Sequence, residues 1–205
     1  MATISRDDHV FVNCPFDSEY SGLFNAIVFA LTHCGFYVRC ALEESDSSVN
    51  RLSKIIHIMS ECRYSIHDIS RTEPDEETGL PRFNMPLELG IFIGAKYSGD
   101  ESQKTKQCLI LDTHPYRYQQ FISDIAGQDI EYHNNDVKKA ITRVRNWLAY
   151  RTNDRRLSSA SIIYNDYVRF QKELPTLCSE SRLDSTDLIF CDFNSLVNEW
   201  ILNAA

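Results

Sequence analysis

The strongest constraint on the fold is a regular alternation, over residues 1–153, of short apolar segments with longer segments of helical periodicity. The short segments are rich in β-branched and aromatic residues, which favour strands. Alternation of this kind predicts successive βαβ units and therefore a parallel sheet with helices on both faces. Five strands are expected, at residues 9–13, 36–40, 64–69, 107–112 and 130–133.

The segments between these strands place apolar residues on one helical face. Leu23, Ile27 and Leu31 recur every fourth residue and predict a helix. Similar patterns predict helices over 52–59 and 136–150. A further helix is expected to begin at Pro86, because proline is favoured at the first helical position. The whole pattern predicts an α/β fold with a doubly wound, five-strand parallel sheet.

Strand patterns stop beyond residue 153, so residues 154–205 are expected to form a helical C-terminal extension of the α/β domain. The last predicted helix has an apolar stripe with helical spacing, which needs a surface to cover it. Packing on the chain's own domain is one interpretation, and a surface for self-association or for a partner protein is the other. The stripe consists of Phe193, Leu196, Val197, Trp200 and Ile201.

Charge and composition exclude several classes of partner. The chain has 29 acidic and 21 basic residues, a net charge of -8, and no run of five like charges, which argues against duplex nucleic acid. Its apolar runs are shorter than the ~18 residues of a membrane span, and no apolar export signal follows Met1, so a cytoplasmic protein is expected. Seven scattered cysteines without a C-x-x-C pair indicate reduced thiols and no zinc site.

Open parallel sheets bind ligands beyond the carboxyl ends of their strands. Four segments are candidates there: 13–17, 43–48, 67–71 and 82–90. The last one closes a polar loop over residues 71–83, and long loops in compact domains are often functional. Neither G-x-G-x-x-G nor a P-loop sequence is present, which argues against ordinary dinucleotide oxidoreductases and P-loop ATPases.

Within residues 82–90, Asn84 and Glu88 are four residues apart and would lie on one face at the start of a helix. A carboxylate there can face the ligand crevice. Cleavage of a nucleoside or nicotinamide glycosidic bond passes through a ribosyl oxocarbenium ion, which a fixed carboxylate stabilises or attacks. A first-turn glutamate stabilised by the helix dipole, and an N-cap role for Asn84, are the simpler alternatives.

The stretch Arg82-x-Asn84-x-x-x-Glu88-Leu89-Gly90-x-Phe92-Ile93-Gly94 resembles the R-x-N-x-x-x-E-L-G-x-F-x-G signature of bacterial TIR-like (Toll/interleukin-1 receptor-like) nucleotide-binding proteins. Its E-L-G part is more distantly similar to the nucleoside 2-deoxyribosyltransferases, which use that glutamate as a nucleophile. The specific match covers residues 82–94, and the strand order extends it to about 8–150. The resemblance implies a flavodoxin-like sheet and Glu88 as the catalytic carboxylate.

Other site residues follow partly from this resemblance. It places the loop after the first strand, with Asn13, Cys14 and Phe16, on the pocket floor, and matches Asp68 to a deoxyribosyltransferase aspartate near the sugar. From their chemistry, Asp68 is expected to assist Glu88 in catalysis, and Asn84 to hold a ribose hydroxyl. By the same reasoning Arg82 would bind phosphate and Tyr118 would contact the base, although a solvated loop cation and a packing aromatic are the alternatives.

The chain also departs from both families. Met85-Pro86 stands where deoxyribosyltransferases have G-T, and Arg82 replaces an acidic residue, which favours hydrolysis over deoxyribosyl transfer. The S-x-x-W-C-x-x-E sequence common in other TIR NAD hydrolases is missing. The hypothesis is therefore an N-glycosidase of NAD or a related nucleotide that needs no cofactor, acts in bacterial antiphage defence, and assembles through its helical tail. A non-catalytic nucleotide sensor and a deoxyribosyltransferase are the alternatives.

Overall fold

The computed structural model describes residues 6–74, 77–152 and 156–204. Their five strands form one sheet in the order β2-β1-β3-β4-β5, and every neighbouring pair is parallel. This confirms the α/β class, the five-strand parallel sheet and a flavodoxin-like strand order. The strands are β1 (His9–Asn13), β2 (Tyr37–Cys40), β3 (Tyr64–Asp68), β4 (Gln107–Asp112) and β5 (Ile130–Tyr132).

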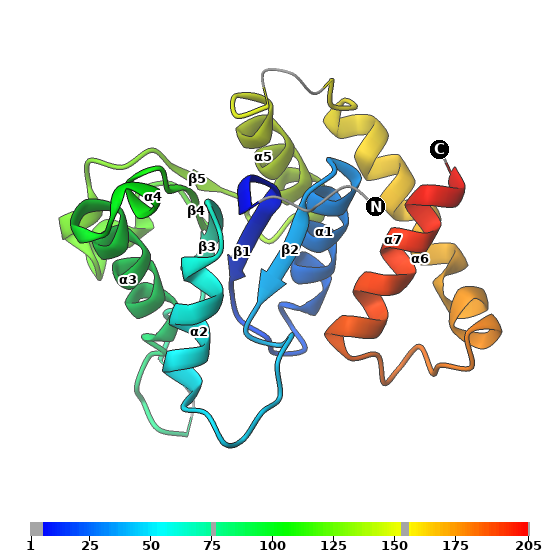
Figure 1. The fold of residues 1–205 in the computed structure, drawn as a ribbon, viewed down its shortest axis with the longest axis horizontal. Coiled ribbons are helices and arrows are strands. Elements are labelled where there is room, and N and C mark those ends of the chain that lie inside the picture. The colour runs from blue at the N-terminus through cyan, green and yellow to red at the C-terminus, as the bar shows by residue number, and fades with distance from the viewer. Residues whose placement is uncertain (1–5, 75–76, 153–155, 205) are drawn as a thin grey trace.

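Helices cover both faces of the sheet (Figure 1). Helices α1 (Ser21–His33) and α5 (Val137–Ala149) lie on one face, and α2 (Arg51–Ser60) and α3 (Asn84–Ser98) lie on the other. Shorter elements complete the connections, namely α4 (Glu101–Lys104) and the 3-10 helices η1 (Arg6–Asp8), η2 (Arg117–Gln120) and η3 (Ser123–Ile125). The order of the strands reverses between β1 and β3, so the ligand crevice of such a sheet is expected beyond these two strands.

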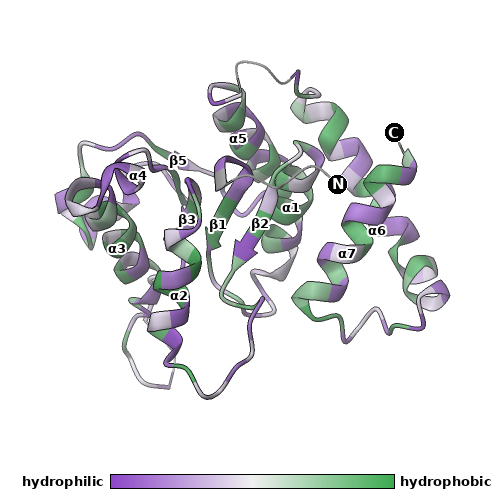
Figure 2. Ribbon diagram, viewed as in Figure 1, coloured by the Kyte–Doolittle hydropathy of each residue, from purple (hydrophilic) through white to green (hydrophobic). Residues whose placement is uncertain are grey.

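The C-terminal helices α6 (Ala160–Glu180) and α7 (Phe190–Ala204) pack on the outer side of α1. The ring of Phe29 in α1 lies 5.4 Å from the rings of Tyr167 and Phe170 and 5.7 Å from that of Trp200. Residues 26–32 of α1 are all buried, because the sheet covers one side of this helix and α6 and α7 cover the other. Figure 2 accordingly shows hydrophobic residues along β1 and α1.

The apolar stripe of the last helix packs on its own chain. Phe193, Leu196, Val197 and Trp200 are each less than a tenth exposed and belong to the same core cluster as β1 and α1. The extension thus shares its core with the α/β domain, and the stripe leaves little free area for a second chain. A homo-oligomer or a partner protein would need another surface.

Two helix starts differ from the sequence prediction. Helix α3 begins at Asn84, two residues before the expected Pro86, and no side chain caps it. Pro86 is tolerated in this first turn because the N–H that it lacks would have no intrahelical acceptor there. Asn84 is therefore not an N-cap. Helix α2 begins at Arg51, one residue before the predicted start. It is capped by Asn50, whose side chain accepts hydrogen bonds from the backbone N–H groups of Leu52 and Ser53.

Three further properties bear on function. None of the described helices is both long and apolar enough to cross a membrane. Within the described ranges, no cluster of three His, Cys, Asp or Glu side chains has a metal-binding arrangement. All seven cysteines are free thiols, and Cys191 is exposed, Cys108 is partly buried and the other five are buried.

Candidate functional site

The candidate site lies at the carboxyl edge of the sheet, where the loops after β1, β2 and β3 gather at the bottom of Figure 1. The register pairs Asn13 with His67, so the ends of β1 and β3 lie side by side at the point where the strand order reverses. Helices α2 and α3 both begin at this edge. The side chains of their first turns therefore face the region where ligands of such sheets bind.

A cavity of about 290 Å³ lies between the first turns of α2 and α3. Three residues of α3 line it, namely Asn84, Leu87 and Glu88, which confirms that Asn84 and Glu88 share one face of this helix. Leu87 and Leu52 are 54% and 40% exposed, so apolar surface is open to a ligand beside the polar groups. The remaining lining residues are Asn50, Arg51 and Ile55.

Glu88 is the carboxylate of this cavity. Its side chain is partly buried, and burial raises its pKa to about 7, although the charge of Arg51 acts in the opposite direction. Within the described ranges, no hydrogen bond or ion pair engages its carboxylate oxygens. A partly desolvated carboxyl group that titrates near neutral pH and has unused acceptors is suited to acid–base or nucleophilic chemistry.

Asp68 lies on the other face of the sheet and is completely buried. Its Oδ2 accepts hydrogen bonds from the Tyr20 hydroxyl (2.5 Å) and from His133 Nε2 (2.9 Å), and its Oδ1 accepts one from the Ser70 amide (2.9 Å). The amide of Asn135 donates to His133 Nδ1 at 3.0 Å, so the ring proton is on Nε2. Asp68 does not line the cavity of Glu88, and the structure does not support the expected catalytic role beside it.

Asn13 joins β1 to α3. Its side chain is 2% exposed, and its Nδ2 lies 3.0 Å from His67 Nδ1 and donates to the carbonyl of Met85 at 2.9 Å. Because Met85 is in the first turn of α3, this contact fixes the start of the helix that carries Glu88. Asn13 is thus a positioning residue for Glu88 and is not exposed to a ligand.

Cys14 and Phe16, in the loop after β1, do not line the Glu88 cavity. Cys14 is 2% exposed, and burial, reinforced by the charges of Asp68 and Glu88, raises its pKa well above the ordinary thiol range, so it stays protonated. Phe16 packs edge-on against Phe24 at 5.3 Å and lines a separate cavity of about 340 Å³ beside α7.

Arg82 and Tyr118 also differ from their expected positions. Arg82 has a 56% exposed side chain whose Nη1 lies 3.9 Å from Asp17 Oδ2, outside the Glu88 cavity. Tyr118 is 4% exposed and packs in a core cluster with Met85 and Leu89, because the 3-10 helix η2 turns its ring inward. Base contact by Tyr118 is therefore corrected to a packing role.

The residue patterns did not indicate the roles of two groups at this edge, Arg51 and Arg117. Arg51 is the first residue of α2 and the cation of the Glu88 cavity, and the Asn50 cap signal just before it was the available clue. Arg117 fixes the loop after β3, since its guanidinium lies 2.6 Å from Asp112 Oδ1 and donates to the carbonyls of Ile69 and Ser70. No local pattern marks this long-range contact.

Searches of protein-family models, curated proteins and solved structures found no match to this chain. The chemistry of the cavity is therefore the basis for a functional inference. It combines a carboxylate of raised pKa, two side-chain amides, a guanidinium and two exposed leucines. Such a set is complementary to a ligand with hydroxyl groups, a flat apolar ring and a negative charge.

Proposed function

We propose that this protein is an N-glycosidase that cleaves the bond between ribosyl C1′ and the base nitrogen of NAD or a related nucleotide, with Glu88 as the catalytic carboxylate. The observation that carries the proposal is the environment of Glu88, whose carboxylate is partly buried, free of described hydrogen bonds and open to a cavity at the carboxyl edge of the sheet. The similarity of residues 82–94 to the TIR-like signature supports the same reaction.

The reaction proceeds by heterolytic cleavage of the C1′–N bond, whose electron pair moves to the base nitrogen and neutralises the pyridinium of NAD. Positive charge develops on the ribose, where ionised Glu88 stabilises it or bonds to C1′. Water then supplies the oxygen that bonds to C1′, and one proton is released. The products are nicotinamide and ADP-ribose. NAD is the substrate in this scheme, and no step requires a separate redox cofactor.

The other residues of the cavity have complementary roles. Asn84 is four residues before Glu88 in α3 and would bond a ribose hydroxyl, because its amide both donates and accepts. Arg51 would bind a phosphate with its guanidinium. Leu52 and Leu87 would contact the base. At about 290 Å³, the cavity is near the lower limit of small-molecule sites, so it would hold one end of a dinucleotide.

The resemblance of residues 82–94 also extends the proposal to a biological role. Bacterial TIR-like proteins act in antiphage defence, where assembly switches on nucleotide consumption, and the same role is proposed for this chain. Because the stripe on α7 is buried by α1 and α6, assembly would use a surface outside that stripe. A cytoplasmic location is part of this proposal.

The test is incubation of the purified chain with NAD and with a panel of nucleotides, at low and high protein concentration, with separation of the products by chromatography. Loss of one substrate in the wild type, and no loss with Glu88→Gln, is the expected result. Glu101→Gln is the matched control, because its side chain is 90% exposed in α4. Transfer of deoxyribose to a free acceptor base would identify a deoxyribosyltransferase, and saturable binding without turnover would identify a nucleotide sensor.

A further inference from the structure

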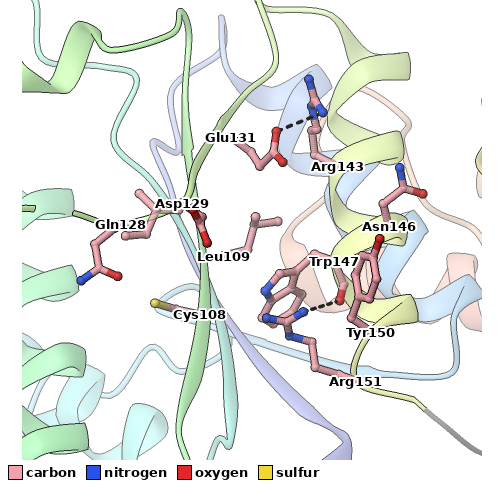
Figure 3. A pocket seen from close by; sticks show the side chains of 11 residues that line it. Cys108, Leu109, Gln128, Asp129, Glu131, Arg143, Asn146, Trp147, Tyr150 and Arg151 are labelled. Atoms are coloured by element: carbon pink, nitrogen blue, oxygen red, sulfur yellow. Dashed lines mark hydrogen bonds and ion pairs between the residues drawn. The ribbon is translucent and has the colours of Figure 1, made fainter. Parts of the chain in front are cut away.

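A second cavity, of about 410 Å³, lies far from Glu88 in the fold, between the amino-terminal ends of β4 and β5 and the last turns of α5 (Figure 3). It exists because β5 is short. The β4–β5 ladder begins at the pair Ile110 and Ile130, so Cys108 and Leu109 of β4 have no strand partner on that side. The opening between this sheet edge and α5 is lined by polar and aromatic side chains.

Two residues that line this cavity carry buried nitrogen donors for which the described residues provide no acceptor. Trp147 is 8% exposed, and its buried Nε1–H has no hydrogen-bond acceptor within the described ranges. Arg151 lies beside it, with the guanidinium carbon 4.7 Å from the centre of the indole ring. The buried Nε–H of Arg151 has no acceptor in the same ranges either. A buried donor without an acceptor is costly, so such pairs are usually satisfied by a ligand or a water molecule.

The charge of Arg151 also has no ion-pair partner among residues 6–74, 77–152 and 156–204. Its Nη1 donates to the backbone carbonyl of Trp147 at 3.0 Å, and no described carboxylate forms an ion pair with it. By contrast, Arg143 on the same wall pairs with Glu131 at 3.0 Å. Figure 3 shows the Trp147 indole and the Arg151 guanidinium side by side on the α5 side of the cavity, across from Cys108 and Leu109. Thus a cation without an ion pair and an N–H donor without an acceptor, as far as the described part of the chain goes, lie next to each other.

The surroundings select the charge and shape of the ligand. Glu131 and Asp129 also line the cavity, and the carboxyl end of α5 carries a partial negative charge, so a doubly charged phosphate is disfavoured and a singly charged carboxylate fits better. Leu109, Ile110 and the ring of Tyr150 provide apolar and aromatic walls. A planar carboxylate can also accept two hydrogen bonds from adjacent N–H donors.

From these contacts we infer that the cavity between β4, β5 and α5 is a binding site for a small monocarboxylate with an apolar or aromatic body. The carboxylate accepts hydrogen bonds from Trp147 Nε1–H and from Arg151, and its body lies against Leu109 and Tyr150. The site is independent of Glu88, since none of its lining residues borders the Glu88 cavity.

The indole N–H resonances allow a direct test with ¹⁵N-labelled protein, because the chain has two tryptophans. Trp200 is an internal reference, since its Nε1 already donates to Glu173 Oε2 at 2.6 Å; Trp200→Phe assigns the two peaks. We expect benzoate to shift the Trp147 peak saturably, with a Kd below about 1 mM, while the Trp200 peak stays in place. Benzamide, which has the same shape without the charge, and inorganic phosphate are expected to leave both peaks unchanged.

Substitution of Arg151 distinguishes specific binding of the carboxylate from nonspecific contact of the benzoate ring with the protein. Arg151→Gln is expected to weaken benzoate binding by about tenfold or more. Arg169→Gln is the matched control, because Arg169 stacks on Trp200 at 4.6 Å and lies outside this cavity. A Trp147 peak that does not move, equal binding of benzamide or phosphate, or an unchanged affinity in Arg151→Gln would each overturn the inference.

Discussion

Two carboxylates, Asp68 and Glu88, lie near the same edge of the sheet but in opposite environments. Asp68 is completely buried on the face covered by α1 and α5 and accepts three hydrogen bonds. Glu88 is partly buried at the start of α3 on the other face, and described residues leave its oxygens unbonded. The comparison shows that burial alone does not indicate a catalytic group. A carboxylate whose acceptors are all used holds the fold together, whereas one with free acceptors in a cavity is available to a substrate.

The largest predicted loss of stability comes from removing the satisfied carboxylate. In Asp68→Ala, the Tyr20 hydroxyl and His133 Nε2–H lose their acceptor in a buried site, so the free energy of unfolding should fall by about 3 kcal/mol. Urea unfolding at pH 7 measures this change as a lower midpoint at constant slope. The exposed Asp187→Ala is the control and should change stability by less than about 0.5 kcal/mol. Equal effects of the two substitutions would contradict the structural role of Asp68.

Glu88→Gln should raise the free energy of unfolding, whereas Asp68→Ala lowers it. The size of this increase should depend on pH. Burial raises the pKa of Glu88 from its usual value to about 7, so the folded protein binds this proton more tightly than the unfolded chain does. The proton on Glu88 therefore stabilises the folded state. This stabilisation is complete below pH ~4.5 and is lost as the pH rises through about 7. Because Gln does not titrate, the stability of the variant relative to wild type should rise by about 3 kcal/mol between about pH 4 and about pH 8. A relative stability that is independent of pH would contradict the raised pKa.

The same ionisation should appear in the rate of the proposed reaction. If ionised Glu88 stabilises the ribosyl cation, kcat/KM should fall about tenfold per pH unit below the pKa and level off above about pH 7. Nicotinamide release from NAD between about pH 5 and about pH 8.5 measures this profile. A flat profile over this range would show that a different group carries the chemistry.

The smallest effects concern the two arginines near the site. Arg51 lines the Glu88 cavity, and Arg51→Gln is expected to raise KM for the nucleotide by about tenfold with a smaller change in kcat. Arg82 lies outside this cavity beside Asp17, and Arg82→Gln is expected to change KM by less than about twofold. The reverse order of these effects would restore Arg82 as the phosphate ligand that its place in the TIR-like signature suggested.

The fold was largely predictable because its signals are local. The apolar runs of β1 and β4 had the predicted bounds, and the regular alternation of strands and helices indicated the sheet topology. Helix α1 was predicted to bury one face, whereas residues 26–32 are all buried; the continuous apolar run over residues 26–31 is the local signal for this wider burial. The start of α3 was misplaced because Pro86 is allowed at more than one position of a first turn.

The site was predictable only in part. The spacing of Asn84 and Glu88 fixes their common face, because helical periodicity is a local property. The partners of Asp68 come from Tyr20 and His133, which are 48 and 65 residues away in sequence, so no local pattern could show that its oxygens are occupied. The prediction that Tyr118 contacts the base was wrong for a related reason, since the burial of Tyr118 depends on how η2 packs against α3.

The role of Glu88 is tested most directly by comparing NAD turnover by wild type, Glu88→Gln and Asp68→Asn, each shown to be folded at the assay temperature. If Glu88 is the catalytic carboxylate, Glu88→Gln should lose about 10³-fold or more of kcat. Asp68→Asn, which keeps an oxygen for Tyr20 and His133, should retain kcat within about threefold of the wild-type value. Turnover that survives in Glu88→Gln and disappears in folded Asp68→Asn would contradict this role of Glu88 and would assign the chemistry to the buried carboxylate.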